Sequence, residues 1–130
     1  MVQIPSPEKI IEFNLLALEL IRVKKADQPK VLSKAKIMQV LGDCAQTNGD
    51  VYEKAGVLLK GLVQKHPFAS GNRRTAFIAT KYFLETNNAK ISVEDNPLNA
   101  KVMLGIRENY YSDGEIKEWI KNGKIKEFKR

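Results

Sequence analysis

The chain has 130 residues, 43% of them hydrophobic, with 22 basic against 15 acidic residues and a formal net charge of +7. This length suits one ordinary domain with its own hydrophobic core, and we expect a single domain over residues 1–130 with a basic tail at about 121–130. Cys44 is the only cysteine, which excludes an internal disulfide, a zinc cluster and a redox CxxC motif and favours a buried, inert thiol.

The first apolar stretch, IIEFNLLALELI, contains Glu12 and Glu19. No basic segment precedes it and charged residues follow it, which argues against a signal peptide or a membrane span. We therefore expect a cytoplasmic protein without a membrane partner. A helix should begin at Ser6 or Pro7 and, because it is apolar on most sides, should be central in the fold. Its two apolar faces are Ile10, Phe13, Leu16 and Leu20, and Ile11, Leu15, Leu18 and Ile21.

A second, more exposed helix is indicated after Pro29 by residues that recur at helical spacing. The polar run GDCAQTNGD, residues 42–50, should end this helix, because Gly42 and Asn48-Gly49 are turn signals. The same run has room for a short hairpin or a mobile flap. The helically spaced positions are Val31, Lys34, Ala35, Met38, Leu41 and Cys44.

A third amphipathic helix is predicted from Val51 to Lys65, with Asp50 as its N-cap. It should stop near His66, because Pro67 disfavours helical geometry in the residue before it. Residues 67–71 then form a short loop. The expected buried positions of the helix are Ala55, Leu58, Leu59, Leu62 and Val63.

A fourth helix should start at Gly71 or Asn72 and end at Asn87-Asn88, because asparagine tolerates the left-handed conformation that ends many helices. A short extended piece, Lys90 to Val93, should follow. The expected buried positions of the helix are Thr75, Ala76, Ala79, Tyr82 and Phe83.

Asn96-Pro97 should open a fifth helix, and Ser112 with Glu115 forms a capping box for a sixth. The basic tail KNGKIKEFKR should fray. No strand pattern or repeat interrupts these segments, so the sequence predicts an all-α bundle of about six helices with at most a minor hairpin or flap. Further core positions are Leu98, Val102, Met103, Ile106 and Trp119, and Tyr110-Tyr111 should close the fifth helix.

The stretch HPFASGNRRTAF, residues 66–77, joins the third and fourth helices and carries the clearest chemical signal. Free backbone N–H groups and the positive end of a helix dipole should face the glycine-containing loop, which makes it a cradle for an anion. Arg73 and Arg74 in the first turn of the fourth helix face the same dipole end, an unfavourable place unless something negative binds. No Asp or Glu occurs between Lys54 and Leu84, while six cations do: Lys54, Lys60, Lys65, Arg73, Arg74 and Lys81.

His66 is the only histidine of the chain and can exchange a proton near neutral pH, as a base that removes a hydroxyl proton must. Phe68 should point into the core and anchor the loop. A plain alternative is a helix-capping turn with a solvated histidine and two surface arginines, since basic surface turns are common.

The order of residues in HPFASGNRRTA resembles the signature HxFx(D/E)GN(G/K)R of the Fic/Doc family. Members transfer part of a nucleotide, most often AMP from ATP, to a hydroxyl of a protein, and the Doc branch phosphorylates elongation factor Tu. The resemblance implies a nucleoside triphosphate such as ATP as the cofactor. It implies His66 as the catalytic base, Phe68 as the structural anchor, Gly71 and Asn72 as the phosphate-binding turn, and Arg74 as a catalytic and phosphate-binding arginine.

Arg73 and Phe77 stand where AMP-transferring members usually carry a glycine and a second arginine, which makes the chain Doc-like. The inhibitory motif (S/T)xxxE(G/N) is absent from the sequence, so restraint should come from a partner antitoxin. The implied target is a cytosolic protein, with a translation factor such as elongation factor Tu as the example that the branch offers.

Ser70 departs from the pattern, because the family places there the Asp or Glu that ligates Mg²⁺. A hydroxyl is a much weaker ligand for this cation than a carboxylate, so Ser70 is assigned to phosphate binding, no metal ligand is assigned and the Mg²⁺ requirement is in doubt. Three interpretations compete. In the first, phosphates and water hold the metal. In the second, a carboxylate from elsewhere, such as Asp43, Asp50 or Glu53, binds it. In the third, the domain binds nucleotide without turnover.

The leading hypothesis is a Doc-like toxin-type transferase that moves a phosphoryl or AMP group to a protein hydroxyl. The second is a degenerate domain that binds nucleotide or phosphate without efficient turnover and acts as a binding or regulatory module. Nucleic-acid binding rests on charge alone, and a solvated basic tail explains that charge better. The cations concerned are Lys117, Lys121, Lys124, Lys126, Lys129 and Arg130.

Overall fold

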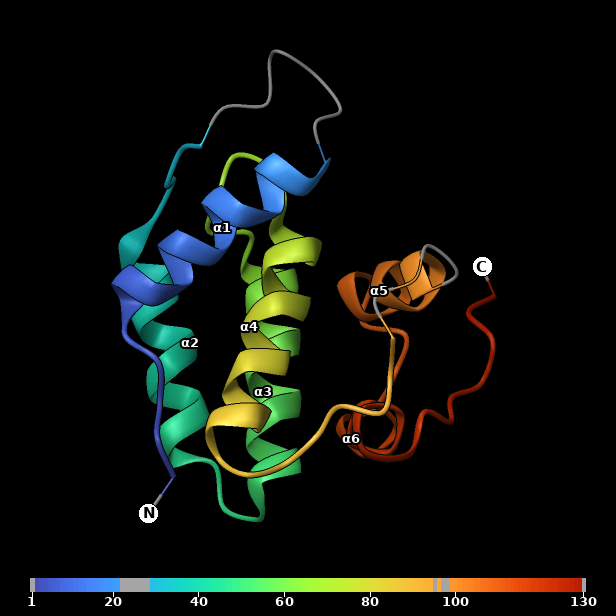
Figure 1. The fold of residues 1–130 in the computed structure, drawn as a ribbon. Coiled ribbons are helices and arrows are strands. Elements are labelled where there is room, and N and C mark those ends of the chain that lie inside the picture. Colours follow the sequence, from blue (N-terminus) through green and yellow to red (C-terminus); the bar gives the residue numbers. More distant parts are fainter. Residues whose placement is uncertain (1, 22–28, 95, 97–98, 130) are drawn as a thin grey trace.

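The computed structural model describes residues 2–21, 29–94, 96 and 99–129. Over these residues the chain forms six α-helices and no β-sheet, which confirms the predicted all-α bundle. In Figure 1, α2, α3 and α4 run side by side, α1 crosses over them, and α5 and α6 lie on the far side of α3 and α4 from α2. The bounds are Pro7–Ile21 (α1), Lys34–Gln46 (α2), Val51–Lys65 (α3), Asn72–Thr86 (α4), Ala100–Arg107 (α5) and Asp113–Asn122 (α6).

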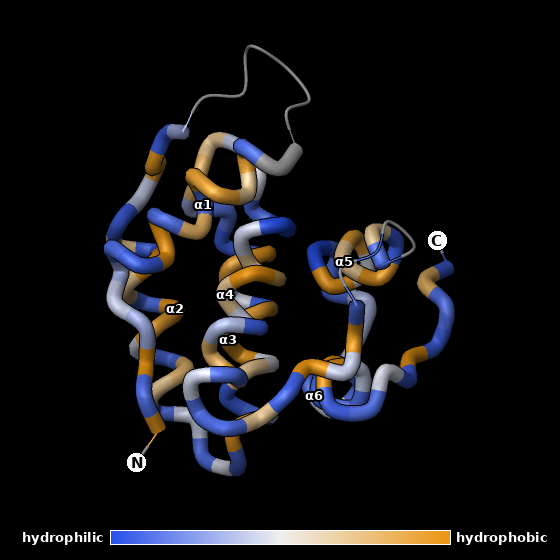
Figure 2. The backbone as a smooth tube through the Cα atoms, in the orientation of Figure 1, coloured by the Kyte–Doolittle hydropathy of each residue, from blue (hydrophilic) through white to orange (hydrophobic). Residues whose placement is uncertain are grey.

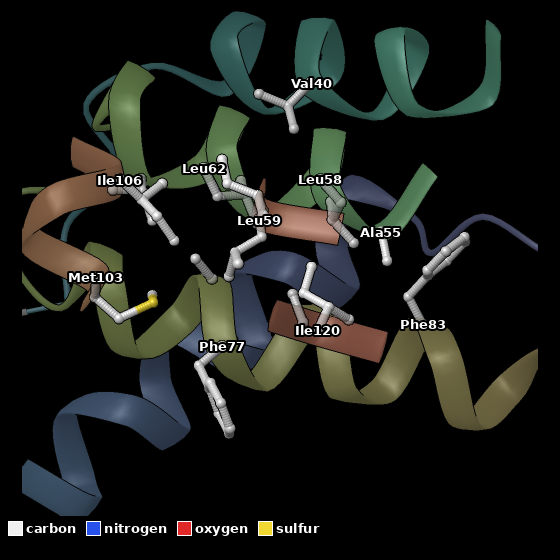
Figure 3. Packing of buried hydrophobic residues seen from close by; sticks show 14 of the residues in the cluster. Val40, Ala55, Leu58, Leu59, Leu62, Phe77, Phe83, Met103, Ile106 and Ile120 are labelled. Atoms are coloured by element: carbon white, nitrogen blue, oxygen red, sulfur yellow. The ribbon is translucent and has the colours of Figure 1, made fainter. Parts of the chain in front are cut away.

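The central helix of the fold is α3, which packs against α2, α4, α5 and α6. Its apolar residues meet side chains from all of these helices in one core, as Figure 3 shows. Gly61 lets α2 approach closely, because a Cβ at this position would lie 2.8 Å from a methyl carbon of Val40. The predicted buried positions of α3 are confirmed: Ala55, Leu58, Leu59, Leu62 and Val63.

The prediction that the first helix is central was wrong, because over the described residues α1 packs mainly against α4 and α2, whereas α3 contacts four helices. Ile10 and Phe13 are buried, whereas Leu15 and Leu16 are 45% and 43% exposed. When a helix is apolar on several sides, its sequence does not tell which side the neighbouring helices cover. Here α4 and α2 cover the side that carries Ile10 and Phe13. The side chains of Leu20 and Ile21 lie outside the described residues. Among the described residues, none of the helices has the length and apolar content that crossing a membrane requires.

The second helix ends within residues 42–50 as predicted, but its buried face differs from the prediction and the optional hairpin at residues 42–50 is not formed. It begins at Lys34, capped by Ser33, whose hydroxyl accepts a hydrogen bond from the backbone N–H of Lys36, and it continues through Gly42 to Gln46. Residues 42–50 therefore hold the last turn and a half of α2 and a short connection, with no hairpin. The buried face is shifted from the predicted one, since Met38 is 57% exposed. The residues that pack inward are Ile37, Val40, Leu41 and Cys44.

The predicted helix caps are confirmed. Asp50 accepts hydrogen bonds from the backbone N–H groups of Tyr52 and Glu53, both at 3.0 Å, and the bond from Glu53 holds the pKa of the Asp50 carboxyl below its ordinary value. At α6, Ser112 and Glu115 form the complete capping box. These two caps start α3 and α6 where the sequence places them.

The segment between α4 and α5 differs in part from prediction. Helix α4 ends at Thr86, and Asn88 takes a left-handed conformation with φ 62° as expected. Lys90 to Val93 pairs with no strand, although the Ser92 N–H donates to the carbonyl of Ile120 at 2.9 Å. Helix α5 begins at Ala100, later than the predicted start at Asn96-Pro97, and residues 97–98, Leu98 included, lie outside the described residues. Val102 is half-buried, whereas Met103 and Ile106 are buried.

The aromatic predictions hold with one exception. Phe83, Trp119 and Tyr111 are buried, but Tyr82 is 37% exposed. Tyr82 packs its ring on Phe13 of α1, with ring centroids 5.0 Å apart, on the outer side of the contact between α1 and α4. The helical spacing placed Tyr82 on the buried face of α4, but α1 covers that face only in part, and Tyr82 lies at its edge.

The basic tail does not fray, contrary to prediction. Phe128 is only 5% exposed and packs against Gly105 of α5 and the ring of Tyr110. The Tyr111 hydroxyl donates to the carbonyl of Lys126 at 3.0 Å. Figure 2 shows the tail as a mainly hydrophilic tube with isolated apolar positions along α5 and α6. The buried Phe128 ring contributes most of the apolar contact, and ion pairs of Lys126 with Glu115 and of Glu127 with Lys101 add to the attachment of the tail.

Replacing Phe128 with Ala should lower the free energy of unfolding by about 3 kcal/mol, the usual cost of removing a buried aromatic ring. Lys129→Ala, one residue further along and exposed, should change it by less than about 0.5 kcal/mol. Urea unfolding followed by circular dichroism measures both. Equal values for the two variants would mean that the tail is detached in solution.

The Cys44 thiol is buried, as predicted, and burial raises its pKa from 9.0 to about 11. The thiol of the unfolded chain therefore loses its proton at lower pH, so the folded state holds more protons between pH 9 and 11. The unfolding free energy should fall with rising pH in this window, by on the order of 1 kcal/mol per pH unit from this group. Urea titrations at pH 8 and 10.5 should show a smaller fall for Cys44→Ala, and an equal fall would contradict the assignment.

Candidate functional site

The loop between α3 and α4 lies where the sequence placed it. His66 ends α3 in a left-handed conformation, with φ 52° and ψ 58°, and is exposed. Gly71, with φ 75°, ends the loop and precedes Asn72, the first residue of α4. The positive φ favours glycine here, and a Cβ at Gly71 would also lie 3.2 Å from a methyl carbon of Leu18, so a side chain would need Leu18 to shift. Phe68 is 1% exposed and anchors the loop in the core, as predicted.

The side chain of Asn72 organises the inside of the loop. Its amide oxygen accepts from the backbone N–H of Phe68 at 3.0 Å, and its amide nitrogen donates to the Phe68 carbonyl at 2.8 Å. The same nitrogen lies 3.2 Å from Nδ1 of His66. Asn72 is only 6% exposed, so these bonds are shielded from water and fix the position of His66 relative to the start of α4.

The bonds of Asn72 also set the orientation of the His66 ring. Because both backbone groups of Phe68 fix which end of the amide is the donor, the amide nitrogen donates and Nδ1 of the ring accepts. The neutral ring then carries its proton on Nε2. To take a proton at Nε2, the ring must exchange tautomer and leave the amide of Asn72 when a substrate hydroxyl arrives. Nδ1 can take a proton without a change of tautomer, but only after it gives up the hydrogen bond from the Asn72 amide.

Asn14 of α1 holds the second half of the loop, and the sequence analysis missed it. Its amide nitrogen donates to the Ser70 carbonyl at 2.9 Å and to the Thr75 hydroxyl at 3.1 Å. That hydroxyl in turn donates to the Gly71 carbonyl at 2.7 Å. Asn14 is 2% exposed. A single asparagine inside the apolar run of the first helix was a usable signal, because a buried amide must find partners.

A second support, also missed, comes from the segment before α2. Val31 and Phe68 form an isolated antiparallel β-bridge. The Pro67 carbonyl accepts from the N–H groups of Leu32 and Ser33 at 2.8 and 3.1 Å, and the Ala69 N–H donates to the Lys30 carbonyl at 2.9 Å. Val31 was assigned to the helix, yet it lies in this bridge with the loop. Residues 42–50 form no hairpin. The bridge between Val31 and Phe68 lies instead in the segment that precedes α2.

Three of the six predicted cations flank the loop. Lys65 lies in the last turn of α3, and Arg73 and Arg74 lie in the first turn of α4. Arg73 is exposed and Arg74 is half-buried. Helix α4 has no acidic residue in its first turn and no side-chain cap at Gly71. The electrostatics at this point favour an anion, since both the helix dipole and the arginines are positive.

The other three cations do not join the site. Lys54 donates to the carbonyls of Ala45, in the last turn of α2, and of Thr47, which caps that helix. Lys60 pairs with Asp113 of α6 at 2.9 Å. Lys81 is exposed further along α4. The acid-free segment from Lys54 to Leu84 therefore does not form one continuous cationic surface.

Ion pairs also engage part of the C-terminal charge. Lys117 lies 3.5 Å from Asp50 and 3.1 Å from Glu53, and Lys126 lies 3.3 Å from Glu115. Arg130 lies outside the described residues.

Comparison with protein families matches residues 19–84 to the Fic/DOC family. The match covers about half of the chain and includes the loop and the helices on both sides of it. Comparison with curated proteins found no match. The chain belongs to the Fic/DOC family, and this membership indicates a function of the transferase type, such as AMPylation, with a nucleoside triphosphate as the substrate used in the family generally.

The donor set at the loop does not suit the Mg²⁺ that the family pattern implies. Ser70 supplies a hydroxyl where a carboxylate is expected. Asp50 and Glu53 cannot replace it, because they lie at the start of α3, about 20 Å along the helix from His66. Asp43 lies in the last turn of α2, next to that same start of α3. Over the described residues, no group of three His, Cys, Asp or Glu side chains is placed to hold a metal ion.

Replacing Asn14 with Asp should lower the free energy of unfolding by about 2 to 4 kcal/mol, because the carboxylate keeps the shape, loses both donors and is buried beside the Ser70 carbonyl. Asn14→Ala should cost about 1 to 3 kcal/mol. Asn122→Asp, an exposed position with one bond to Glu118, is the matched control and should cost less than about 1 kcal/mol. Chemical unfolding measures all three. An Asn14→Asp variant as stable as the control would show that the bonds to the loop contribute nothing.

Proposed function

We propose that the protein is a Doc-like, toxin-type transferase that moves a phosphoryl or AMP group from a nucleoside triphosphate to a hydroxyl of a cytosolic target protein. The observation that carries the proposal is the fixed relation of His66 to the start of α4. Asn72, buried at that start, contacts His66 Nδ1 at 3.2 Å. A proton acceptor therefore lies beside a helix N-terminus with arginines in its first turn. That combination suits transfer of a phosphate group to a hydroxyl.

In the proposed reaction, the hydroxyl oxygen of a Ser, Thr or Tyr attacks a phosphorus atom of the nucleotide and its proton passes to His66. Attack at the γ-phosphorus breaks the bond to the β-phosphate oxygen, so ADP leaves and a phosphorylated protein remains. Attack at the α-phosphorus releases pyrophosphate and leaves an AMP ester. Arg73, Arg74 and the first N–H groups of α4 stabilise the negative charge on the phosphates, with Ser70, Gly71 and Asn72 forming the turn around them.

The Doc-like assignment draws on positions 73 and 77. Arg73 is exposed at the start of α4 and adds a cation there. Phe77 is 6% exposed and belongs to the hydrophobic core, so this position has no role in holding phosphate. By analogy with the Doc branch, the proposed target is a translation factor such as elongation factor Tu, and the proposed restraint is a partner antitoxin.

A second candidate function is a nucleotide- or phosphate-binding regulatory module without efficient turnover. The observation that favours it is Ser70, because the loop keeps its hydrogen-bonded form while the carboxylate is missing. Binding and transfer are separable measurements, so the two candidates make different predictions.

Transfer is tested by incubating the protein and a cell lysate with ATP labelled at the α- or the γ-phosphate. We expect a labelled protein band whose intensity falls at least about 100-fold in His66→Ala, the usual loss when a general base is removed. Label from the γ-phosphate alone identifies phosphorylation, and label from the α-phosphate alone identifies AMP transfer. Asn122→Ala, far from the loop, serves as the control and should label as the wild type does.

If His66→Ala labels as strongly as wild type while remaining folded, His66 is not the base and the transferase proposal is overturned. If neither phosphate is transferred but the protein binds ATP, the regulatory module is the better description. Circular dichroism of each variant separates loss of chemistry from loss of fold.

A further inference from the structure

We infer that the loop binds its nucleotide as the metal-free polyanion, with protein cations and backbone N–H groups in place of a divalent cation. The inference rests on the proposed nucleotide-binding function and specifies which form of the nucleotide the site accepts. It follows from two properties of the loop. Most of its backbone carbonyls already accept hydrogen bonds, and the charged side chains of the loop and of the helix turns on either side of it are positive.

Four of the five backbone carbonyls of residues 67–71 accept hydrogen bonds within the protein. The Pro67 carbonyl accepts from the N–H groups of Leu32 and Ser33, and the Phe68 carbonyl accepts from the Asn72 amide. The Ser70 carbonyl accepts from the Asn14 amide, and the Gly71 carbonyl accepts from the Thr75 hydroxyl. The amide oxygen of Asn72 accepts from the Phe68 N–H. A hard cation such as Mg²⁺ needs several oxygen ligands in near-octahedral geometry, and recruiting these would break the bonds that hold the loop.

The charges around the loop disfavour a cation as well. The sequence has no Asp or Glu from Lys54 to Leu84, a stretch that contains the loop and most of both flanking helices. Lys65, Arg73 and the N-terminal end of α4 are all positive, and Arg73 points to solvent where a ligand can reach it. The same features that repel a divalent cation attract phosphate oxygens.

Metal-free ATP carries about two more negative charges than its Mg²⁺ complex. In a loop that offers only positive charge, those extra charges strengthen binding, because each added charge at about 6 Å in a watery environment is worth roughly a factor of three in affinity. A site built around a carboxylate has the opposite preference, since free ATP and the carboxylate repel each other.

The test is the dissociation constant of ATP, measured by isothermal titration calorimetry in EDTA and in excess MgCl₂ at matched ionic strength. For the wild type we expect the constant in EDTA to be smaller than that in MgCl₂ by on the order of tenfold, because two extra charges each contribute about a factor of three. Ser70→Asp restores the carboxylate, so it should weaken binding in EDTA by about tenfold and recover in MgCl₂. Ser6→Asp is the matched control, because it adds the same charge at the exposed N-terminal cap of α1, about 18 Å along that helix from Leu18.

The outcomes are distinct. Binding in EDTA that equals or exceeds binding in MgCl₂ supports the inference, and Ser6→Asp should follow the wild type in both buffers. Wild-type binding that requires Mg²⁺ overturns the inference and leaves the proposed transferase function standing. Absence of ATP binding in both buffers by a folded protein overturns the inference and the proposed function together.

Discussion

The amide of Asn72 connects three parts of the candidate site with one side chain. It satisfies both backbone groups of Phe68 and contacts the ring of His66. A buried amide in this position costs stability unless all of its partners are present. The loop conformation, the location of His66 and the start of α4 are therefore interdependent, because moving any one of them leaves buried polar groups without partners.

The rest of the fold holds this arrangement from two directions. Asn14 reaches the Ser70 carbonyl from α1, and the extended residues before α2 bind Pro67 and Ala69. Behind the loop, Phe68 enters a core centred on α3. The loop is thus a rigid surface element, held by elements that are far apart in the chain. Rigidity of this kind favours phosphate chemistry, which depends on position more than on reactive side chains.

Charge at the loop has a cost that a ligand can offset. Arg73 and Arg74 lie at the positive end of α4, where each cation destabilises a helix by a few tenths of a kcal/mol. A bound phosphate attracts both arginines and the helix end, which offsets this cost. The family match covers this loop, and the signature that the loop resembles has an acidic residue at the position of Ser70. This chain therefore offers a more cationic site than the family pattern, which connects its proposed function to the form of nucleotide that it prefers.

The sequence by itself determined the helical class, both helix boundaries at the loop, the caps at Asp50 and Ser112 and the burial of Phe68. These features depend on local chemistry, because a proline, a glycine or a capping side chain acts on its nearest neighbours in the chain. The buried face of α3 could also be predicted, since a central helix has its whole apolar stripe covered.

Only the tertiary structure decided which elements lie against the loop. The bonds of Asn14 to Ser70 and Thr75, the pairing of Val31 with Phe68 and the attachment of the tail through Phe128 join residues that are distant in sequence. The same holds for the exposure of Leu15, Leu16 and Met38, because helical spacing describes a face without naming the neighbour that covers it. It holds also for the partners of Lys54 and Lys60, which bind the end of α2 and Asp113 of α6. The separation of Asp50 and Glu53 from His66 follows instead from the length of α3, because residues at opposite ends of one helix lie far apart wherever the helix packs.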